Sequence, residues 1–265
     1  MNPVVVKIGG STLGEHDTTI SDLVRLQSAG VPIVVVHGGG STISEWLGKQ
    51  GIETEFVDGL RVTTSQSLDV AVAVLSGLIN KQIVAELAQS DGKAVGLSGA
   101  DGGLLVGQTF DERLGLGGNV TEVDGSIVTA IVDQGFIPVV APVAVEAKGQ
   151  KVSDSGLLNL NADTAAAHIA VELNASMLVF LTDVAGILDN DGNLLAEVDL
   201  KRGEELLSSG VVTRGMIPKV EACLRALSSG IKSYIVDGRK QDTLLGVVRG
   251  DSHKLEGTVF SPSVS

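Results

Sequence analysis

Cysteine is nearly absent from this 265-residue sequence, and this limits the chemistry open to it. The single cysteine, Cys223, can form no disulfide within the chain and no thiolate metal cluster. It lies in a helix-like pattern, KVEACLRAL, where a buried thiol with a packing role is expected. The histidines are too scattered to predict a metal site; they are His16, His37, His168 and His253.

Basic residues are also scarce, since 19 lysines and arginines face 32 aspartates and glutamates, giving a formal net charge of −13. This balance argues against nucleic acid and against an anionic membrane as partners, and a small anionic substrate would need a local cluster of cations. The sequence shows no charged-then-apolar leader, and no unbroken apolar run approaches the about 20 residues of a membrane span. We therefore expect a cytoplasmic protein that binds neither nucleic acid nor membrane.

Several common catalytic signatures are missing as well. The sequence contains no G-x-x-x-x-G-K-[ST] loop and no G-x-G-x-x-G after a strand, which excludes the usual NTPase and dinucleotide fingerprints. It also contains no G-x-S-x-G elbow and no H-E-x-x-H pair. Any enzymatic function must therefore rest on a different arrangement of residues.

Glycine, by contrast, is abundant, with 34 residues, and much of it follows runs of β-branched residues. Such apolar runs without alternation predict strands buried on both faces. We expect these strands at residues 4–8, 31–37, 93–99, 136–142, 176–182 and 231–236, with an edge strand at 257–260.

Segments with an apolar residue every three or four positions lie between the strands and predict helices. They are residues 19–29, 41–50, 65–89, 126–134, 164–173, 199–208, 214–227 and 241–248. A D-G pair predicts a hairpin at 56–63, and a second hairpin is expected at 145–153, turned at Gly149. Residues 104–124 mix short β runs with turns and receive no assignment. Strands that alternate with helices predict an α/β fold with a parallel sheet.

Glycines and polar residues occur in five segments interpreted as strand ends, KIGG, HGGG, GLSG, NLNAD and TDVAG. The carboxyl ends of parallel strands meet at one edge of a sheet, where ligands bind. Each turn alone is ordinary strand-to-helix geometry. Together they predict an edge lined with backbone N–H groups that suits anionic ligands.

Five side chains near these turns are candidates for a site. Lys7, at the end of the first strand, either extends to solvent or faces an anion beside the glycines. Arg61 either is solvated or grips a carboxylate. Lys219 and Asp163 lie near the N-termini of their helices. A lysine is electrostatically unfavourable there and suits a partner anion, whereas an aspartate is favourable there and could be purely structural. His37 either orients the loop after its strand or acts as a general base, and the structural role is favoured.

Six segments resemble, in order and spacing, the motifs of the amino acid kinase family: KIGGS, VVVHGGG, DGLRVT, NLNADTAAA, LTDVAGILD and TRGMIPKV. The match runs essentially end to end. The resemblance implies a three-layer αβα sandwich with an open, mainly parallel central sheet. It also implies an N-terminal lobe, residues 1–173, that binds an amino acid and forms a homodimer, and a C-terminal lobe, residues 174–265, that binds ATP.

The resemblance assigns roles to particular residues. It implies that Lys7 and Lys219 stabilise the transferred phosphoryl group and that Asp163 holds both lysines. Substrate contacts are implied for Gly39, Gly40, Arg61 and Asn159. Phosphate or nucleotide contacts are implied for Gly9, Gly10, Asp183, Val184, Ala185, Gly186, Ile187, Leu188, Val211, Val212 and Thr213. No protein ligand to a metal is expected, because Mg²⁺ would be held mainly by the phosphates of ATP.

Within the family, these motifs resemble members that phosphorylate the γ-carboxylate of N-acetyl-L-glutamate by direct in-line transfer. The product would be N-acetyl-L-glutamyl 5-phosphate, in arginine biosynthesis. A carboxylate is already ionised at neutral pH, so no general base is required. Members inhibited by arginine carry a helix before the first strand; here only Met1 and Asn2 precede Pro3, so we expect no such inhibition.

Two other functions remain open. A kinase of the same fold could act on another carboxylate, such as a carrier-bound aminoadipate. DGLRVT and NLNAD favour acetylglutamate, and the net charge gives no sign of a basic docking face. A non-catalytic, nucleotide-binding sensor is the second alternative, and the joint presence of Lys7, Asp163 and Lys219 argues against it.

Overall fold

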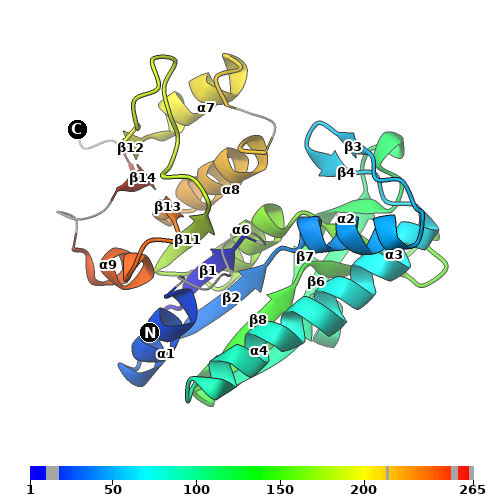
Figure 1. The fold of residues 1–265 in the computed structure, drawn as a ribbon, viewed down its shortest axis with the longest axis horizontal. Coiled ribbons are helices and arrows are strands. Elements are labelled where there is room, and N and C mark those ends of the chain that lie inside the picture. The colour runs from blue at the N-terminus through cyan, green and yellow to red at the C-terminus, as the bar shows by residue number, and fades with distance from the viewer. Residues whose placement is uncertain (10–17, 213–214, 252–255, 263–265) are drawn as a thin grey trace.

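The computed structural model describes residues 1–9, 18–212, 215–251 and 256–262. An eight-stranded sheet lies at its centre, with the order β12-β14-β13-β11-β1-β2-β8-β5 (Figure 1). The strands from β13 to β5 run parallel, whereas β14 is antiparallel to β13. In chain order the strands are β1 (Val4–Ile8), β2 (Ile33–His37), β5 (Ala94–Ser98), β8 (Ile137–Ala141), β11 (Met177–Thr182), β12 (Glu197–Val198), β13 (Ser233–Asp237) and β14 (Gly257–Phe260).

Helices cover both faces of this sheet, which accounts for the unbroken apolar runs in its central strands. Every residue of β1, β2 and β8 is buried. On one face Val5 and Val34 pack with α5 (Ser126–Asp133), α6 (Ala162–Glu172), α7 (Leu200–Ser208) and α8 (Ile217–Ser228). On the other face Val6 and Val35 pack with α1 (Thr19–Ser28), α2 (Gly40–Lys49), α9 (Thr243–Arg249) and the long helix described next. The expected three-layer α/β sandwich is confirmed.

One long helix runs through residues 65–89 as predicted, with an irregular centre. It consists of α3 (Ser65–Val72), a π-helical segment η1 (Ala73–Ile79) and α4 (Asn80–Gln89). Thr64 begins it with a capping box: its side chain accepts from the Ser67 N–H, and its own N–H donates to Ser67 Oγ. By length and composition this helix could cross a membrane, although polar residues interrupt its apolar run. Its apolar side is buried against the sheet.

A second, smaller sheet arises from segments that the sequence left unclear. Its strands are β6 (Leu105–Thr109), β7 (Gly117–Val123), β9 (Val143–Glu146) and β10 (Leu157–Leu160), which close into a barrel in the order β10-β7-β6-β9. The first two come from the unassigned residues 104–124.

Two expectations are wrong here. The hairpin at 145–153 does not form, because β9 pairs with β10 rather than with the segment just after Gly149. That segment is polar around an exposed Val152, whereas β10 has three leucines among its four residues and buries two of them. The expectation that all five polar strand ends share one sheet edge also fails, because Asn159 belongs to β10 of the barrel.

The D-G hairpin is confirmed as a short ribbon of β3 (Phe56–Val57) and β4 (Leu60–Arg61). Asp58 and Gly59 both have positive φ, 51° and 85°, as the tight two-residue turn requires.

In the large sheet β1 pairs directly with β11, so residues on both sides of position 173 share one sheet. The division into lobes 1–173 and 174–265 stays a prediction.

Candidate active site

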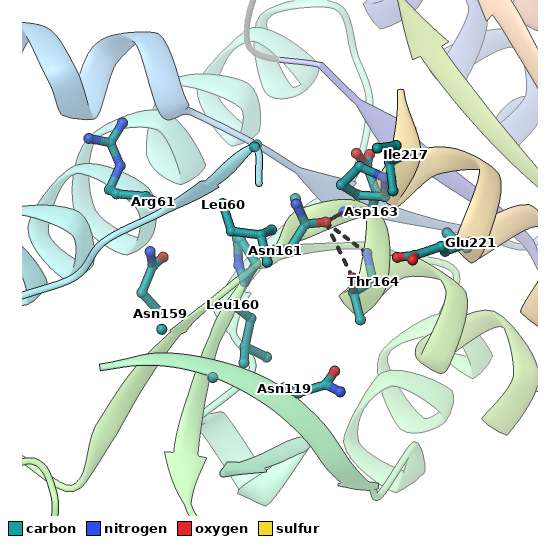
Figure 2. Close-up of a pocket in the computed structure, with 18 of the residues that line it drawn as sticks. Leu60, Arg61, Asn119, Asn159, Leu160, Asn161, Asp163, Thr164, Ile217 and Glu221 are labelled. Carbon is teal, nitrogen blue, oxygen red and sulfur yellow. Dashed lines mark hydrogen bonds between the residues drawn. The ribbon is translucent and has the colours of Figure 1, made fainter. Parts of the chain in front are cut away.

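A cavity of about 1000 Å³ opens where β1 and β2 end. Its walls come from distant parts of the chain: the turn after β2, the β3–β4 hairpin, the barrel strands, the start of α6 and one side of α8 (Figure 2). The polar residues on these walls include Lys7, Arg61, Asn119, Asn159, Asn161, Asp163, Glu221 and Arg225. Four of these eight had been selected from the sequence.

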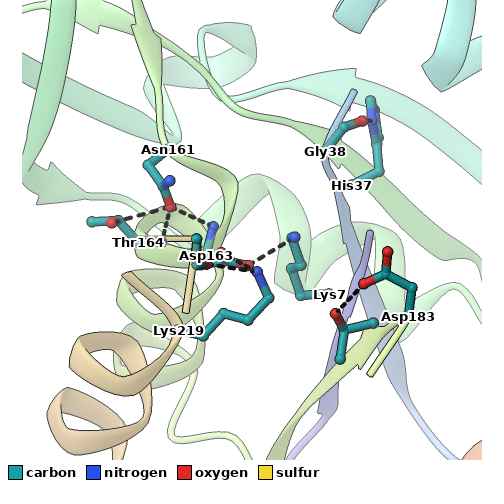
Figure 3. Close-up of polar contacts among 10 residues, drawn as sticks. Lys7, His37, Gly38, Asn161, Asp163, Thr164, Asp183 and Lys219 are labelled. Carbon is teal, nitrogen blue, oxygen red and sulfur yellow. Dashed lines mark hydrogen bonds and ion pairs between the residues drawn. The ribbon is translucent and has the colours of Figure 1, made fainter. Parts of the chain in front are cut away.

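At one end of the cavity, two lysines share one buried carboxylate (Figure 3). Lys7 Nζ lies 2.8 Å from Asp163 Oδ1, and Lys219 Nζ lies 3.0 Å from Asp163 Oδ2. The side chains of Lys7 and Asp163 are 7% and 6% exposed, and that of Lys219 is 15% exposed. The structure thus brings together the three residues that were predicted as catalytic, from β1, α6 and α8.

The shape of this cluster follows from its helix starts. Asn161 caps α6 through its Oδ1, which accepts from the N–H groups of Asp163 and Thr164 at 2.9 and 3.0 Å. This cap fixes the first turn of α6, and with it the position of Asp163. Pro218 lies in the first turn of α8, where it costs no helical hydrogen bond. Asn161 was missed as a site residue, although an asparagine at a helix start is a recognisable cap signal.

Electrostatics within the cluster work in opposite directions. Burial alone would raise the pKa of Asp163, but the two lysines outweigh it and hold the pKa of this carboxyl below its usual range. Burial also lowers the pKa of Lys7, and the charge of Asp163 opposes that effect. Two lysines against one carboxylate leave room for an additional anion.

The glycine turn after β2 forms the adjacent wall. Residues 38–40 line the cavity. A Cβ on Gly39 would lie only 2.3 Å from Ile79 Cδ1, so a larger residue there would require the Ile79 side chain to shift. The Gly9 N–H donates to Leu181 O at 3.0 Å, and the phosphate contact expected of Gly9 stays a prediction. Gly9 is not among the residues that line the cavity, and Gly10 lies outside the described residues.

Arg61 and Asn159 lie on the hairpin side of the cavity. Arg61 Nη2 donates to Gly40 O at 2.7 Å and to Ser44 Oγ at 2.8 Å, and the guanidinium lies over the Phe56 ring. Its buried Nη1 has no hydrogen-bond partner within the described chain. Asn159 Nδ2 donates to Thr63 Oγ1. Arg61 is therefore not a solvated hairpin residue, and it has a donor to spare for a ligand.

The predicted nucleotide segment lies outside this cavity. Asp183 follows β11 and is exposed, with one oxygen accepting from Thr182 Oγ1. Gly186 packs so closely on β14 that a Cβ there would lie 2.6 Å from Thr258 Oγ1. Val184 and Leu188 are 39% and 50% exposed. Of the remaining residues of this prediction, Ala185 and Val211 are half-buried, Ile187 and Val212 are buried, and Thr213 lies outside the described residues.

Two other predictions are resolved by packing. In the GLSG turn a Cβ on Gly99 would lie 2.4 Å from Leu105 Cδ1, and neither Ser98 nor Gly99 lines the cavity. This turn packs against the start of β6, where the Leu105 N–H donates to Gly99 O. His37 is 1% exposed, and burial lowers its pKa to about 4, so it is neutral at neutral pH. These properties agree with the favoured structural role.

Several wall residues were missed. Asn119 belongs to the unassigned segment that forms β7, so no strand pattern pointed to it. Pro218, Glu221 and Arg225 are spaced three and four residues apart, so they share one face of α8. This helical spacing was the sequence signal that could have identified Glu221 and Arg225. Among the described residues, no group of three or more His, Cys, Asp or Glu side chains could hold a metal ion.

Comparison with known proteins places this geometry in a family. Residues 2–237 match the amino acid kinase family. The chain belongs to the amino acid kinase family. It is 42% identical over 236 residues to the acetylglutamate kinase of Dehalococcoides mccartyi (strain ATCC BAA-2266 / KCTC 15142 / 195), covering 89% of this chain and 87% of that one. It is 44% identical over 250 residues to the acetylglutamate kinase of Synechococcus sp. (strain RCC307), covering 91% and 82%.

The family fold extends over the whole chain. The crystal structure of smu.665 from Streptococcus mutans UA159 is similar with a TM-score of 0.83 and 26% sequence identity, and the match covers 99% of both chains. The family expected from the sequence motifs is therefore confirmed, together with its fold.

Proposed function

We propose that this chain transfers the γ-phosphoryl group of ATP to the γ-carboxylate of N-acetyl-L-glutamate, a step of arginine biosynthesis. The observation that carries the proposal is the pair Lys7 and Lys219 on the single buried carboxylate of Asp163, in a cavity that also presents Arg61. The relatives named acetylglutamate kinase, at 42% and 44% identity, support the choice of substrate.

The main barrier to this reaction is electrostatic, because two anions must meet. Lys7 and Lys219 carry one positive charge more than Asp163 can neutralise. Their Nζ atoms, 2.8 and 3.0 Å from its oxygens, are held in place before a substrate arrives. Fixed donors of this kind stabilise the charge that spreads over the equatorial oxygens of a transferring phosphoryl group. Asp163 in this proposal orients the lysines and takes no proton.

The substrate itself supplies the nucleophile. An oxygen of its γ-carboxylate attacks the γ-phosphorus of ATP, the bond between that phosphorus and the β,γ-bridging oxygen breaks, and ADP leaves with the electron pair. The carboxylate is ionised at neutral pH, so no proton has to be removed. The neutral, buried His37 is therefore not needed as a base. The product is the acyl phosphate N-acetyl-L-glutamyl 5-phosphate.

Arg61 and Asn159 are proposed to hold the rest of the substrate. The unpartnered Arg61 Nη1 can donate to the α-carboxylate, while Nη2 keeps its bonds to Gly40 O and Ser44 Oγ. The Asn159 side chain, anchored to Thr63 Oγ1, lies on the same side of the cavity. Gly39 and Gly40 complete this wall.

We propose that residues 183–188 and 211–213 bind ATP, with Mg²⁺ held mainly by its phosphates. The described residues offer no cluster of ligands for a metal ion, and Mg²⁺ usually keeps several waters and binds through substrate phosphates. When bound, the ion neutralises phosphate charge. We expect exposed Asp183, beside Lys7 at the sheet edge, to lie near that complex.

The test is acyl phosphate formation, trapped with hydroxylamine, in the presence of ATP and Mg²⁺. N-acetyl-L-glutamate, glutamate, aspartate and N-acetyl-α-aminoadipate are compared, with Lys7→Ala as the inactive control. Turnover on N-acetyl-L-glutamate, lost in the variant, is the expected result. Preference for another acid would contradict the substrate, and nucleotide binding without any turnover would favour the sensor.

We also propose a cytoplasmic homodimer without nucleic acid or membrane partners. The support for a second copy is β5, the edge strand of the large sheet, where Val95 is 37% exposed. An edge strand carries unpaired backbone groups that a second sheet can satisfy. Light scattering should give twice the mass of one chain, and Val95→Lys should shift this mass toward the monomer.

A further inference from the structure

The turn at residues 38–40 has to be held firmly, because two parts of the proposed site depend on it. It lines the cavity beside Lys7, and Gly40 O accepts the hydrogen bond that fixes Arg61. Its first residue is tied to β1, since the Gly38 N–H donates to Ile8 O at 3.0 Å. Glycines have little intrinsic preference for one backbone conformation, so the remaining constraint must come from neighbouring side chains.

His37 supplies one such constraint. It is buried at the end of β2, and its Nδ1 lies 2.9 Å from Gly38 O (Figure 3). A carbonyl oxygen can only accept, so Nδ1 carries the proton and donates. In the neutral ring Nε2 must then be an acceptor, and it faces Asn80 Nδ2 at 3.2 Å. The two contacts together select a single tautomer.

Asn80 fixes that arrangement from the opposite side. It is 0% exposed, and its Nδ2 lies 2.8 Å from Val139 O and 3.2 Å from Leu97 O. Both partners are carbonyls, which requires the NH₂ group on this side. Lys81 Nζ donates to the Asn80 Oδ1 at 2.9 Å, in agreement with that orientation. The two hydrogens of this NH₂ group are shared among Val139 O, Leu97 O and His37 Nε2, and in this way Asn80 joins the long helix to β8, β5 and β2.

The π-helical segment brings the same helix against the turn a second time. Ile79, its last residue, packs against Gly39 together with Leu75. Asn80 follows directly as the first residue of α4. The extra residue per turn in a π-helix changes which side chains share a face, and such segments recur at functional sites. Here Ile79 packs against Gly39, and Asn80 bonds to His37, the residue that directly precedes the turn at residues 38–40.

We propose that Asn80 is a positioning residue for substrate binding, which acts through the neutral His37 to hold the turn at residues 38–40. Asn80 does not line the cavity, so its proposed effect on the substrate is indirect. The inference rests on the proposed function for its kinetic consequence, but its structural part concerns the ligand-free protein. The charged groups that affect His37 are Lys7 on β1 and Lys81 on α4.

The kinetic test compares Asn80→Ala with Gln82→Ala, an exposed amide two residues along the same helix. Loss of the turn's support should raise the KM for N-acetyl-L-glutamate about tenfold, the effect of one weakened hydrogen bond, whereas the KM for ATP changes less than about twofold. Gln82→Ala should leave both constants unchanged. A merely structural role would lower the midpoint of unfolding without this split, and that result would overturn the proposal.

A second measurement needs no substrate. The imidazole ¹⁵N spectrum of His37 in the free wild-type protein should show the Nδ1–H tautomer alone, and Asn80→Ala should give a tautomer mixture. An unchanged spectrum would overturn the inference, while failure of the kinase assay alone would contradict only the proposed function. If Asn80→Ala does not fold, His37→Gln breaks the same link and leaves Asn80 its bonds to Val139 O and Leu97 O. The same split between the two KM values is then expected.

Discussion

The proposed phosphoryl-transfer cluster and the proposed nucleotide segment meet at the ends of the neighbouring strands β1 and β11, through Lys7 and Asp183, yet these two side chains differ in burial. Lys7, Asp163 and Lys219 are buried and bonded to one another. Asp183 and Leu188, at the end of β11, are exposed. The cluster is organised before any ligand binds, whereas the nucleotide segment offers loop surface.

This difference matches the demands on each region. Groups that stabilise a transition state must be held in place in advance, because reorganising them during the reaction costs rate. A site that binds and releases a nucleotide in every cycle can be open to solvent. We therefore expect substitutions in the buried region to reduce kcat and stability together, and substitutions in the exposed segment to act on KM for ATP.

Asp163→Asn should have the largest effect. It leaves two lysines near each other without their carboxylate, so kcat should fall on the order of 10³-fold. The loss of one partner from a buried ion pair should also lower the free energy of unfolding by about 3 kcal/mol. Steady-state kinetics and urea unfolding measure the two effects. Asp133→Asn, at an exposed position, is the control and should change neither; a fully active Asp163→Asn variant would contradict the proposed role.

Arg61→Lys should have a smaller and more selective effect. Lysine keeps the charge but lacks the planar fork that reaches Gly40 O and a ligand carboxylate together. The KM for N-acetyl-L-glutamate should rise about 10- to 100-fold, with the KM for ATP unchanged. Isothermal titration with each ligand checks this directly. Equal weakening of both ligands would mean that Arg61 supports the fold of the site instead of binding the substrate.

The large sheet was predictable because its signal is local. Runs such as that in β1 are apolar at every position, and the glycines after them mark where strands end. The barrel was not predictable. Its strands β9 and β10 are separated by ten residues without regular structure, and their pairing depends on contacts that sequence pattern does not encode. Short strands of mixed polarity give no clear period.

The same distinction applies to the site. The motif resemblance predicted that Lys7, Asp163 and Lys219 belong together, but residue spacing could not show that the Gly9 N–H is used within the sheet. Asn80 carries no motif at all. Its importance depends on carbonyls of β5 and β8 that the fold brings to it from residues 97 and 139.

Acidification should lower the free energy of unfolding through the buried groups His37 and Asp163. The pKa of His37 lies at about 4 in the folded protein, below its ordinary value, so the unfolded chain takes up a proton first as pH falls. Stability should therefore decrease from about pH 6.5 downward, by about 2 kcal/mol between pH 7.5 and 5 for this histidine. Asp163, with a lowered pKa, adds a further loss only as the pH falls below about 4.

Urea unfolding at pH 7.5 and pH 5 measures this slope. His37→Gln should remove the His37 contribution, whereas His168, whose pKa is also lowered by burial to about 4, adds a contribution of the same sign that the variant keeps. An identical slope in wild type and His37→Gln would show that the ring is not kept neutral by the fold.

Asp183→Asn should have the smallest effect and tests the exposed side of the comparison. The side chain is solvated, so removing its charge should leave the free energy of unfolding within about 0.5 kcal/mol of wild type. If Asp183 serves the nucleotide and its Mg²⁺, the KM for ATP should rise about threefold to tenfold, because one solvent-screened charge contributes about 1 kcal/mol, with the KM for N-acetyl-L-glutamate unchanged. Titration of Mg²⁺ at fixed ATP should show the variant needing more of the ion. A fall in kcat as large as that of Asp163→Asn would instead place Asp183 with the buried cluster, and the contrast between the two regions would not hold.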